Sequence, residues 1–241
     1  LKGRRFTEVI EKFGGVVLGK RFALKGQKRL PVMLKFIDAN DRLSIQVHPD
    51  DEYAMEHENG KSGKTEMWYI VDAKPSATII HGFCQNYSND KIREAVLKCK
   101  YKGLYREVPV KKGDVVYVPA GTVHALNDGI VVAEIQQHSD LTYRLFDYDR
   151  KDSEGRKRPL HLKKALDVLD FRSYKPLYKG IPIYYDKIKT RILAVSKYFC
   201  VRLIEGRDVP VELVADGSFS AFMFIEGEAR IVSDTETVPA G

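Results

Sequence analysis

Apolar residues along the chain recur with two different periods, which predicts short strands interrupted by a few helices. Phe6, Val9, Ile10 and Phe13, for example, have the spacing that puts them on one face of a helix. The predicted helices cover residues 5–18, 49–59, 89–104 and 161–169. The predicted strands cover residues 31–37, 43–47, 66–71, 78–81, 115–118, 130–135, 142–146, 191–195, 199–204, 219–225 and 229–232.

This pattern predicts a mainly β fold. Short strands with turn signals between them are typical of a jelly-roll barrel, which closes its sheet edges and leaves a ligand cavity at one end. We predict one such barrel with inserted helices in residues 1–160, and a bridging helix and a second barrel in residues 161–241. The second barrel is predicted from a weak internal repeat that pairs residues 222–227 with 68–73 and 238–241 with 118–121.

Length and composition describe an ordinary globular chain. Its 241 residues are 44% hydrophobic, which is enough for one large core or two modest ones. No stretch approaches the roughly 20 apolar residues of a membrane span, so we expect no membrane partner. The three cysteines are an odd number in a chain without a secretory signal, so we expect reduced thiols, no disulfide and a cytoplasmic location.

The net charge of +7 is compatible with an anionic partner. Much of the excess lies in residues 150–158, a polar loop of the kind that is usually only solvated. The chain has neither the interleaved aromatic residues of a base-stacking surface nor a helix-turn-helix or finger signature, which disfavours nucleic acid. A phosphorylated small molecule needs only two or three cations, so it fits this charge better.

Four polar residues could supply the ligands of a divalent metal. Gln46 and His48 are two positions apart on a predicted strand and therefore point to the same face. Glu66 opens an apolar strand, and His124 follows a Pro-Ala-Gly turn that can direct a side chain inward. Each residue alone is more often a structural polar group, but the combination favours a metal site. Nitrogen and oxygen donors without thiolates suit zinc first, with iron, manganese or cobalt as alternatives.

The remaining histidines and the second barrel are not expected to contribute metal ligands. His48 and His124 already supply two nitrogen ligands, and we expect structural roles for the others, which are His57, His81, His138 and His161. In the internal repeat Ser220 occupies the place of Glu66. We therefore expect a metal-free second barrel, which we also expect to be incomplete in this chain.

The candidate ligands lie within motifs that resemble a known family. Residues 113–124 resemble the second cupin motif, and Gln46-Val47-His48 with Glu66 replaces the usual His-x-His of the first motif. With residues 34–49, 63–66 and 139–144, these motifs strongly resemble the type I mannose-6-phosphate isomerases of the short bacterial and archaeal kind. The match covers most of residues 30–165 and implies a cupin fold for both barrels.

The resemblance also implies an activity and roles for several residues. The expected reaction interconverts mannose 6-phosphate and fructose 6-phosphate through a cis-enediol, with a bound metal and a fixed arginine stabilising the developing charge. Arg144 matches the family's active-site arginine, Lys64 a lysine that faces the substrate, and Ser44 a serine linked to phosphate binding. Lys64, Glu134 and a metal-bound water remain candidates for the proton-transferring base. Asp140 is predicted to contribute to substrate binding.

Three alternatives remain open from the sequence. Glu134 or Asp140 could pair with Arg144 and fix its guanidinium, or these charges could form only an ordinary cross-strand ion pair. A metal-dependent cupin dioxygenase would use two histidines and a carboxylate on Fe(II). A non-catalytic sugar-binding cupin is favoured if Arg144 or Lys64 points away from the metal.

Overall fold

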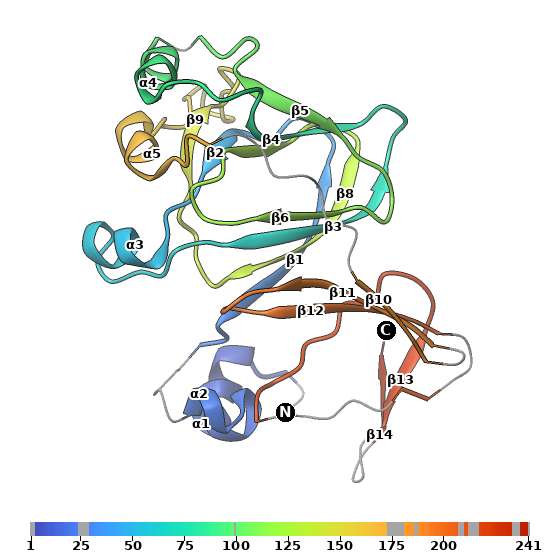
Figure 1. Ribbon diagram of the computed structural model, residues 1–241. Helices are drawn as coiled ribbons and strands as arrows, with labels where there is room; N and C mark the ends of the chain where they lie inside the picture. Colours follow the sequence, from blue (N-terminus) through green and yellow to red (C-terminus); the bar gives the residue numbers. More distant parts are fainter. Residues whose placement is uncertain are drawn as a thin grey trace. The chain divides into compact units, whose positions relative to one another are not determined.

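Strands dominate the chain, as the sequence predicts (Figure 1). The computed structural model describes residues 3–23, 29–98, 100–172, 181–185, 188–206, 210–211, 217–232 and 237–240. The helices are α1 (Phe6–Leu18), α2 (Lys20–Ala23), α3 (Asp51–His57), α4 (Asn89–Leu97) and α5 (Leu162–Val168). The strands are β1 (Val32–Ala39), β2 (Ile45–Val47), β3 (Glu66–Ala73), β4 (Thr78–Phe83), β5 (Tyr105–Pro109), β6 (Val115–Val118), β7 (His124–Leu126), β8 (Ile130–Gln137), β9 (Tyr143–Phe146), β10 (Ile181–Tyr185), β11 (Ile188–Val195), β12 (Cys200–Gly206), β13 (Ala229–Val232) and β14 (Thr237–Ala240). None of these helices has the length and apolar composition of a membrane-spanning segment.

The chain divides into two compact units. The larger comprises Pro31–Val211, and the smaller comprises Leu1–Leu30 with Glu212–Gly241. The predicted boundary at residue 160 does not coincide with this division. The sheet β10–β12 falls in the larger unit, where for example the Tyr198 hydroxyl donates to Asp51 Oδ2 at 2.8 Å.

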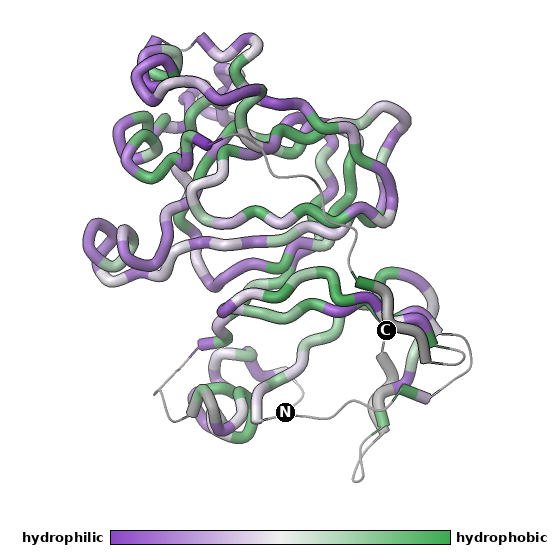
Figure 2. The backbone as a smooth tube through the Cα atoms, viewed as in Figure 1, coloured by the Kyte–Doolittle hydropathy of each residue, from purple (hydrophilic) through white to green (hydrophobic). Residues whose placement is uncertain are grey.

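Two antiparallel sheets form the body of the larger unit. One has the strand order β5-β4-β7-β2-β9 and the other the order β1-β8-β3-β6. Apolar side chains from both sheets, including Trp68, Ile79 and Val132, form one buried cluster. The two sheets therefore face each other across a common interior, and Figure 2 shows hydrophobic segments along these strands. Such burial supplies most of the free energy that favours folding.

Helices α4 and α5 pack on the other face of the five-stranded sheet. Ile92 and Val96 of α4 and Leu166 of α5 join a second buried cluster with alternate residues of strands β2, β4, β7 and β9. Helix α4 begins where the Ser88 hydroxyl accepts a hydrogen bond from Lys91 N, a common N-terminal cap. Each strand of this sheet therefore has one face toward the helices and one face toward the interior.

Several predicted elements differ from the structure. The helix predicted to reach residue 104 ends at Leu97, and Tyr105–Pro109 instead forms β5, which pairs with β4. The strand predicted over residues 219–225 is absent, and the hairpin β13–β14 follows it. Strands β7 and β10 were not predicted. In each case the pairing partner, which local sequence does not specify, decides whether a segment becomes a strand.

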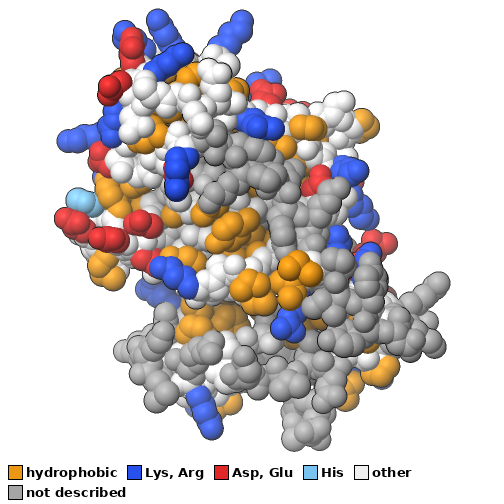
Figure 3. Space-filling model, in the orientation of Figure 1, with side chains coloured by type: hydrophobic (Ala, Val, Ile, Leu, Met, Phe, Trp, Pro, Cys, Tyr) orange, Lys and Arg blue, Asp and Glu red, His pale blue; other side chains and the backbone are white. Residues whose placement is uncertain are grey.

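Charged side chains are mixed on the surface. On the face shown in Figure 3, the described Lys and Arg side chains lie among Asp and Glu rather than in one stripe. Residues 150–158 contain ion pairs of their own, such as Arg156 with Asp152 at 3.1 Å. The expectation that this loop is mainly a solvated segment agrees with these contacts.

Candidate metal centre and active site

Four polar side chains form a row across the five-stranded sheet. His81 of β4 lies opposite His124 of β7, His124 lies opposite Gln46 of β2, and Gln46 lies opposite Arg144 of β9. Their sequence neighbours, such as Val47, belong to the cluster beneath the helices. Because side chains alternate along a strand, the row faces the interior between the two sheets.

The four-stranded sheet contributes carboxylates to the same interior. Glu66 on β3 is followed at alternate positions by Trp68 and Ile70, which both belong to the buried cluster between the sheets. Glu66 pairs with Gln136 of β8, and Trp68 pairs with Glu134. The interior is thus apolar along most of its length and polar where these residues meet the row on the opposite sheet.

Three of the four predicted metal ligands converge on one point. Glu66 Oε1 lies 3.3 Å from His124 Nε2, and Glu66 Oε2 lies 3.4 Å from His48 Nε2. Their candidate ligand atoms all lie within 4.8 Å of one another, and all three side chains are almost fully buried. Gln46 Nε2 lies 3.3 Å from His124 Nε2, which brings the fourth predicted ligand to the same point. Histidine nitrogens with carboxylate and amide oxygens form a donor set that a divalent cation can use.

Hydrogen bonds at the histidines agree with a metal-binding role. His124 Nδ1 lies 2.9 Å from the Thr122 carbonyl oxygen, which leaves Nε2 with a lone pair toward the donors. His48 also presents Nε2, while its buried Nδ1 has no hydrogen-bond partner. A half-turn of the Gln46 amide would exchange Nε2 with Oε1 and direct the oxygen toward the same point. The residues therefore fit a metal ion with Gln46 in the flipped orientation.

Burial keeps both histidines neutral. Loss of solvation and the nearby Lys64 ammonium lower the pKa of His48 from its ordinary 6.5 to about 3. Burial also lowers the pKa of His124. Burial alone would raise the pKa of Glu66, but the nearby Lys64 ammonium holds it well below its ordinary value. The site therefore presents two neutral imidazoles and one anionic carboxylate, the protonation states that metal binding requires.

Lys64 points directly at these donors. Its ammonium lies 2.9 Å from Glu66 Oε2 and 3.0 Å from His48 Nε2, and its side chain is buried. Lys64 and Glu66 are two positions apart, which puts them on one side of the segment that enters β3. The candidate substrate-facing lysine is therefore next to the predicted metal ligands.

Glu134 is held on both sides by hydrogen bonds. Trp68 Nε1 donates to Glu134 Oε1 at 3.2 Å, and Lys35 Nζ donates to Glu134 Oε2 at 2.7 Å. Burial and the negative charge of Glu66 raise the pKa of Glu134. Lys35 also donates to Gln136 Oε1 at 2.5 Å. Sequence reasoning missed Lys35, although its place on β1 within residues 34–49 could have marked it as part of the resembling segment.

Arg144 has other charged neighbours than those expected. Asp140 is exposed and lies 3.0 Å from Lys61, and Glu134 pairs with Lys35, so neither carboxylate is seen to pair with Arg144 in the described contacts. Burial and the positive charge of Arg158 lower the pKa of Arg144, while Asp147 acts to raise it. The inward direction of Arg144 follows from its pairing with Gln46 rather than from a contact with either carboxylate.

The other predicted polar residues have mixed positions. Ser44 is buried and donates to Gln46 Oε1 at 3.2 Å, beside the predicted metal ligands. His81 is buried, and its Nε2 lies 3.1 Å from the Tyr117 carbonyl oxygen. His57 packs against Tyr53 near the protein surface, with 4.2 Å between ring centroids and the rings tilted by 43°. Among the described residues, the candidate ligand group contains neither of these two histidines.

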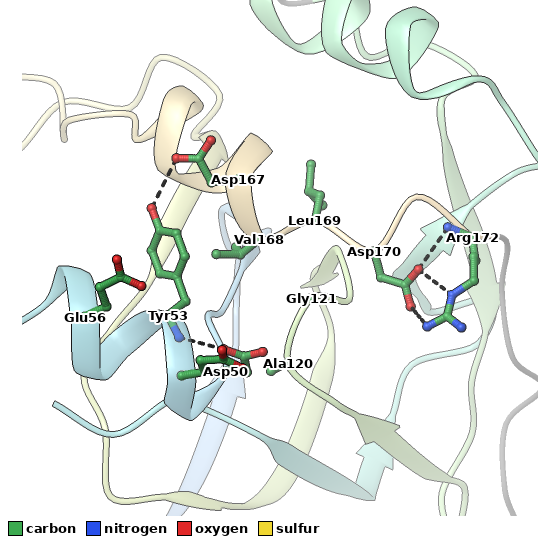
Figure 4. Close-up of a pocket in the computed structure, with 11 residues that line it drawn as sticks. Asp50, Tyr53, Glu56, Ala120, Gly121, Asp167, Val168, Leu169, Asp170 and Arg172 are labelled. Carbon is green, nitrogen blue, oxygen red and sulfur yellow. Dashed lines mark hydrogen bonds and ion pairs between the residues drawn. The ribbon is translucent and has the colours of Figure 1, made fainter. Parts of the chain in front are cut away.

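A separate pocket of about 440 Å³ lies outside this site. It is lined by α3, the turn at Ala120 and Gly121, the end of α5 and the segment after α5 (Figure 4). Its charged lining is mainly carboxylates, and its Arg172 already pairs with Asp170 at 2.7 Å. This charge disfavours a phosphorylated ligand, and none of the candidate metal ligands lines the pocket.

Comparisons with known proteins identify relatives of this chain. Residues 3–64 match the family model of the catalytic domain of type I phosphomannose isomerase. The chain is 41% identical over 213 residues to mannose-6-phosphate isomerase ManA of Bacillus subtilis, and the match covers 88% of this chain and 66% of that relative. It is 37% identical over 244 residues to the putative mannose-6-phosphate isomerase YvyI of the same organism, and that match covers 99% of this chain and 73% of that relative.

A solved structure extends the similarity to the fold. The crystal structure of the mannose 6-phosphate isomerase from Bacillus subtilis matches with a TM-score of 0.85 and 33% identity. The match covers 99% of this chain and 74% of the other. The chain spans about half to two thirds of the length of the first curated relatives that it matches.

Proposed function

Because this chain belongs to the type I phosphomannose isomerase family, we propose that it interconverts mannose 6-phosphate and fructose 6-phosphate in a metal-dependent reaction. The observation that carries this proposal is the buried group of Gln46, His48, Glu66 and His124 with the Lys64 ammonium beside it. We also propose that the two facing sheets form a cupin-type jelly roll, in which the polar end of the interior is the ligand cavity.

A divalent ion, with zinc as the first choice, would be held by Gln46, His48, Glu66 and His124. When bound, it would supply a Lewis acid that polarises the sugar oxygens at C1 and C2. The buried position of the ligands excludes most water from this point, which strengthens electrostatic interactions with the reacting atoms.

Glu134 and Lys64 are the two side chains best placed to move the proton between C2 and C1. Glu134 is fixed by Trp68 and Lys35, so its carboxylate has a defined direction in the interior. Lys64 lies within 3.0 Å of two candidate ligand atoms. A base must lie within hydrogen-bond reach of the proton that it removes, and both groups face the interior where that proton would be.

Arg144 is the proposed stabiliser of the enediolate. Its pairing with Gln46 directs it toward the same interior, and a guanidinium can donate two parallel hydrogen bonds to the developing oxyanion. The non-catalytic sugar-binding alternative requires Arg144 or Lys64 to point away from the metal ligands. The contacts of Lys64 and the register of Arg144 argue against it.

The described contacts differ in how well they support the substrate-binding roles predicted for Ser44, Lys64 and Asp140. The phosphate is attached to C6, several bonds from the reacting C1 and C2. Ser44 and Lys64 both lie beside the predicted metal ligands, so Lys64 fits a role near the reacting carbons better than a role at the phosphate. The Asp140 carboxylate is exposed and paired with Lys61, which gives its proposed substrate contact the least support.

The proposal is tested by measuring fructose 6-phosphate formation from mannose 6-phosphate before and after treatment with a chelator. We expect chelation to abolish activity and added zinc to restore it. His124→Ala should remove both metal and activity, while the matched control His57→Ala, which replaces an exposed histidine, should keep both. Full activity in the metal-free protein would reject the metal-dependent mechanism. Oxygen consumption with Fe(II) and no ketose product would instead indicate a cupin dioxygenase.

A further inference from the structure

Asp51, at the start of α3, accepts hydrogen bonds from three other segments of the larger unit. Its Oδ1 accepts hydrogen bonds from Gly63 N and from Gln137 Nε2, each at 2.9 Å. Its Oδ2 accepts a hydrogen bond from the Tyr198 hydroxyl at 2.8 Å. These donors belong to the segment before β3, the end of β8 and the turn between β11 and β12.

The segment fastened by Asp51 is the one that carries Lys64 and Glu66. Gly63 N donates to Asp51, Lys64 N donates to the Pro49 carbonyl oxygen at 2.9 Å, and Thr65 N donates to Gln137 Oε1 at 2.8 Å. Three successive backbone N–H groups are therefore fixed just before Glu66. Asp51 makes the first of these bonds directly and orients Gln137, which makes the third.

The approach of the two backbones is close enough to require glycine. A Cβ atom at Gly63 would lie 2.5 Å from Asp51 N, a separation that side-chain carbons do not adopt. The segment before β3 therefore lies directly on the start of α3, immediately after His48 and Pro49. A displacement of the Asp51 backbone would therefore also displace His48, just before α3, and the segment that carries Lys64 and Glu66.

Hydrogen bonds within the turn between β11 and β12 fix the backbone on both sides of Tyr198. Ser196 Oγ accepts hydrogen bonds from Tyr198 N and Phe199 N, each at 3.1 Å, and Ser196 N donates to the Phe199 carbonyl oxygen at 2.9 Å. Lys197 Nζ in the same turn lies 3.6 Å from Asp51 Oδ2. Hydrogen bonds to a charged acceptor are stronger than neutral ones, so this contact favours one orientation of the carboxylate.

We propose that Asp51 is a positioning residue that fixes Lys64 and Glu66 at the active site, and that Tyr198 of the β11–β12 turn holds Asp51 in place. This inference rests on the proposed isomerase function. It gives the sheet β10–β12, whose described residues include none of the candidate ligands, a part in the reaction. A misplacement of about 1 Å can lower a catalytic rate by about a hundredfold, so a contact one step removed from the reacting atoms can control kcat.

The test compares Asp51→Ala with Asp51→Asn and with Glu52→Ala, which removes an exposed carboxylate from the same first turn of α3. We expect Asp51→Ala to lower kcat about tenfold or more with little change in KM, because Lys64 and Glu66 lose their alignment. Asp51→Asn keeps an acceptor for Gly63 N and should retain most of kcat. Glu52→Ala should behave as the wild type. A normal kcat in Asp51→Ala, or an equal fall in Glu52→Ala, would overturn the proposal.

Zinc affinity provides a second readout that does not depend on turnover. Calorimetric titration of zinc into the metal-free protein should show that Asp51→Ala weakens binding about tenfold, as expected when the support of a ligand is removed. Unchanged zinc affinity would overturn the positioning of Glu66. If the wild type binds zinc but has no isomerase activity, the proposed function fails while this comparison still tests Asp51.

Tyr198→Phe tests the part of the β11–β12 turn. It removes one hydroxyl and keeps the ring, so we expect kcat to fall about threefold, the effect of one lost hydrogen bond of modest strength. Tyr87→Phe is the matched control, because its hydroxyl donates to the Gly103 carbonyl oxygen at 3.1 Å near the surface. Equal activity in both variants would remove Tyr198 from the proposal.

Discussion

Replacing Lys64 with Met should destabilise the metal-free protein far more than the metal-bound protein. The Lys64 ammonium lies 2.9 Å from Glu66 Oε2, and both side chains are buried. His48 and His124 are neutral because burial lowers the pKa of each, so Lys64 is the main cation facing this carboxylate. Breaking a buried ion pair by removing one partner costs about 3–5 kcal/mol, because the other charge is left without compensation.

The expected loss is large enough to measure. In a chain of this size, about 1 kcal/mol of unfolding free energy changes Tm by roughly 2–4 °C, so Lys64→Met should lower the Tm of the metal-free protein by about 6–20 °C. A bound divalent ion would compensate the Glu66 charge in place of the ammonium. The variant should therefore lose much less stability when it is saturated with zinc, and the assay is thermal unfolding with zinc and with a chelator.

Lys61→Met is the matched control for this experiment. Lys61 lies 3.0 Å from Asp140 Oδ1, nearly the same separation as in the buried pair. The side chains of Lys61 and Asp140 are both at least half exposed. Exposed pairs contribute about 0–1 kcal/mol, so this variant should unfold within a few degrees of the wild type. Equal losses in the two variants, or a loss in Lys64→Met that zinc does not reduce, would refute the reasoning about burial.

Three further predictions follow from the site. Arg144→Lys should lower kcat about tenfold or more with a smaller effect on KM and with metal content intact, because an ammonium lacks the planar pair of donors; an unchanged kcat would leave Arg144 with a structural role. Acidification should destabilise the metal-free protein as pH falls from about 6.5 toward 4. In the folded protein the pKa values of His48 and His81 are lowered from 6.5 to about 3 and about 4. The unfolded chain therefore takes up protons at these histidines first, which favours unfolding. A constant urea midpoint over this range would contradict that prediction. Ser44→Ala should raise KM for mannose 6-phosphate if Ser44 contacts phosphate, and an unchanged KM would exclude that contact.

The direction in which the side chains of the candidate metal ligands point could be predicted from local sequence. Gln46 lies on β2 and His48 follows that strand directly, two positions away, and the turn before His124 directs its side chain inward. These features depend on residues that are close in sequence, where the period of a strand fixes the direction of a side chain. The mainly β fold follows for the same reason.

Contacts that depend on sheet register could not be predicted. Glu134 and Arg144 are near in sequence, but Glu134 lies on β8 of one sheet and Arg144 lies on β9 of the other. Lys35 looks like a solvent-facing lysine until its pairing with Glu134 across β1 and β8 is known. The strand predicted over residues 219–225 has the right alternation but no pairing partner in the described structure. Register and pairing are set by the whole fold, which a local pattern does not contain.

The most direct test of the central claim is a stoichiometric zinc titration of the metal-free protein, with fructose 6-phosphate formation measured at each step. We expect activity to rise in proportion to bound zinc and to reach its maximum at about one ion per chain, the value for a single site with four protein ligands. In the zinc-saturated protein, X-ray absorption should show only nitrogen and oxygen ligands at roughly 2.0–2.2 Å. Activity that does not depend on bound zinc, or sulfur ligands around the ion, would contradict the account.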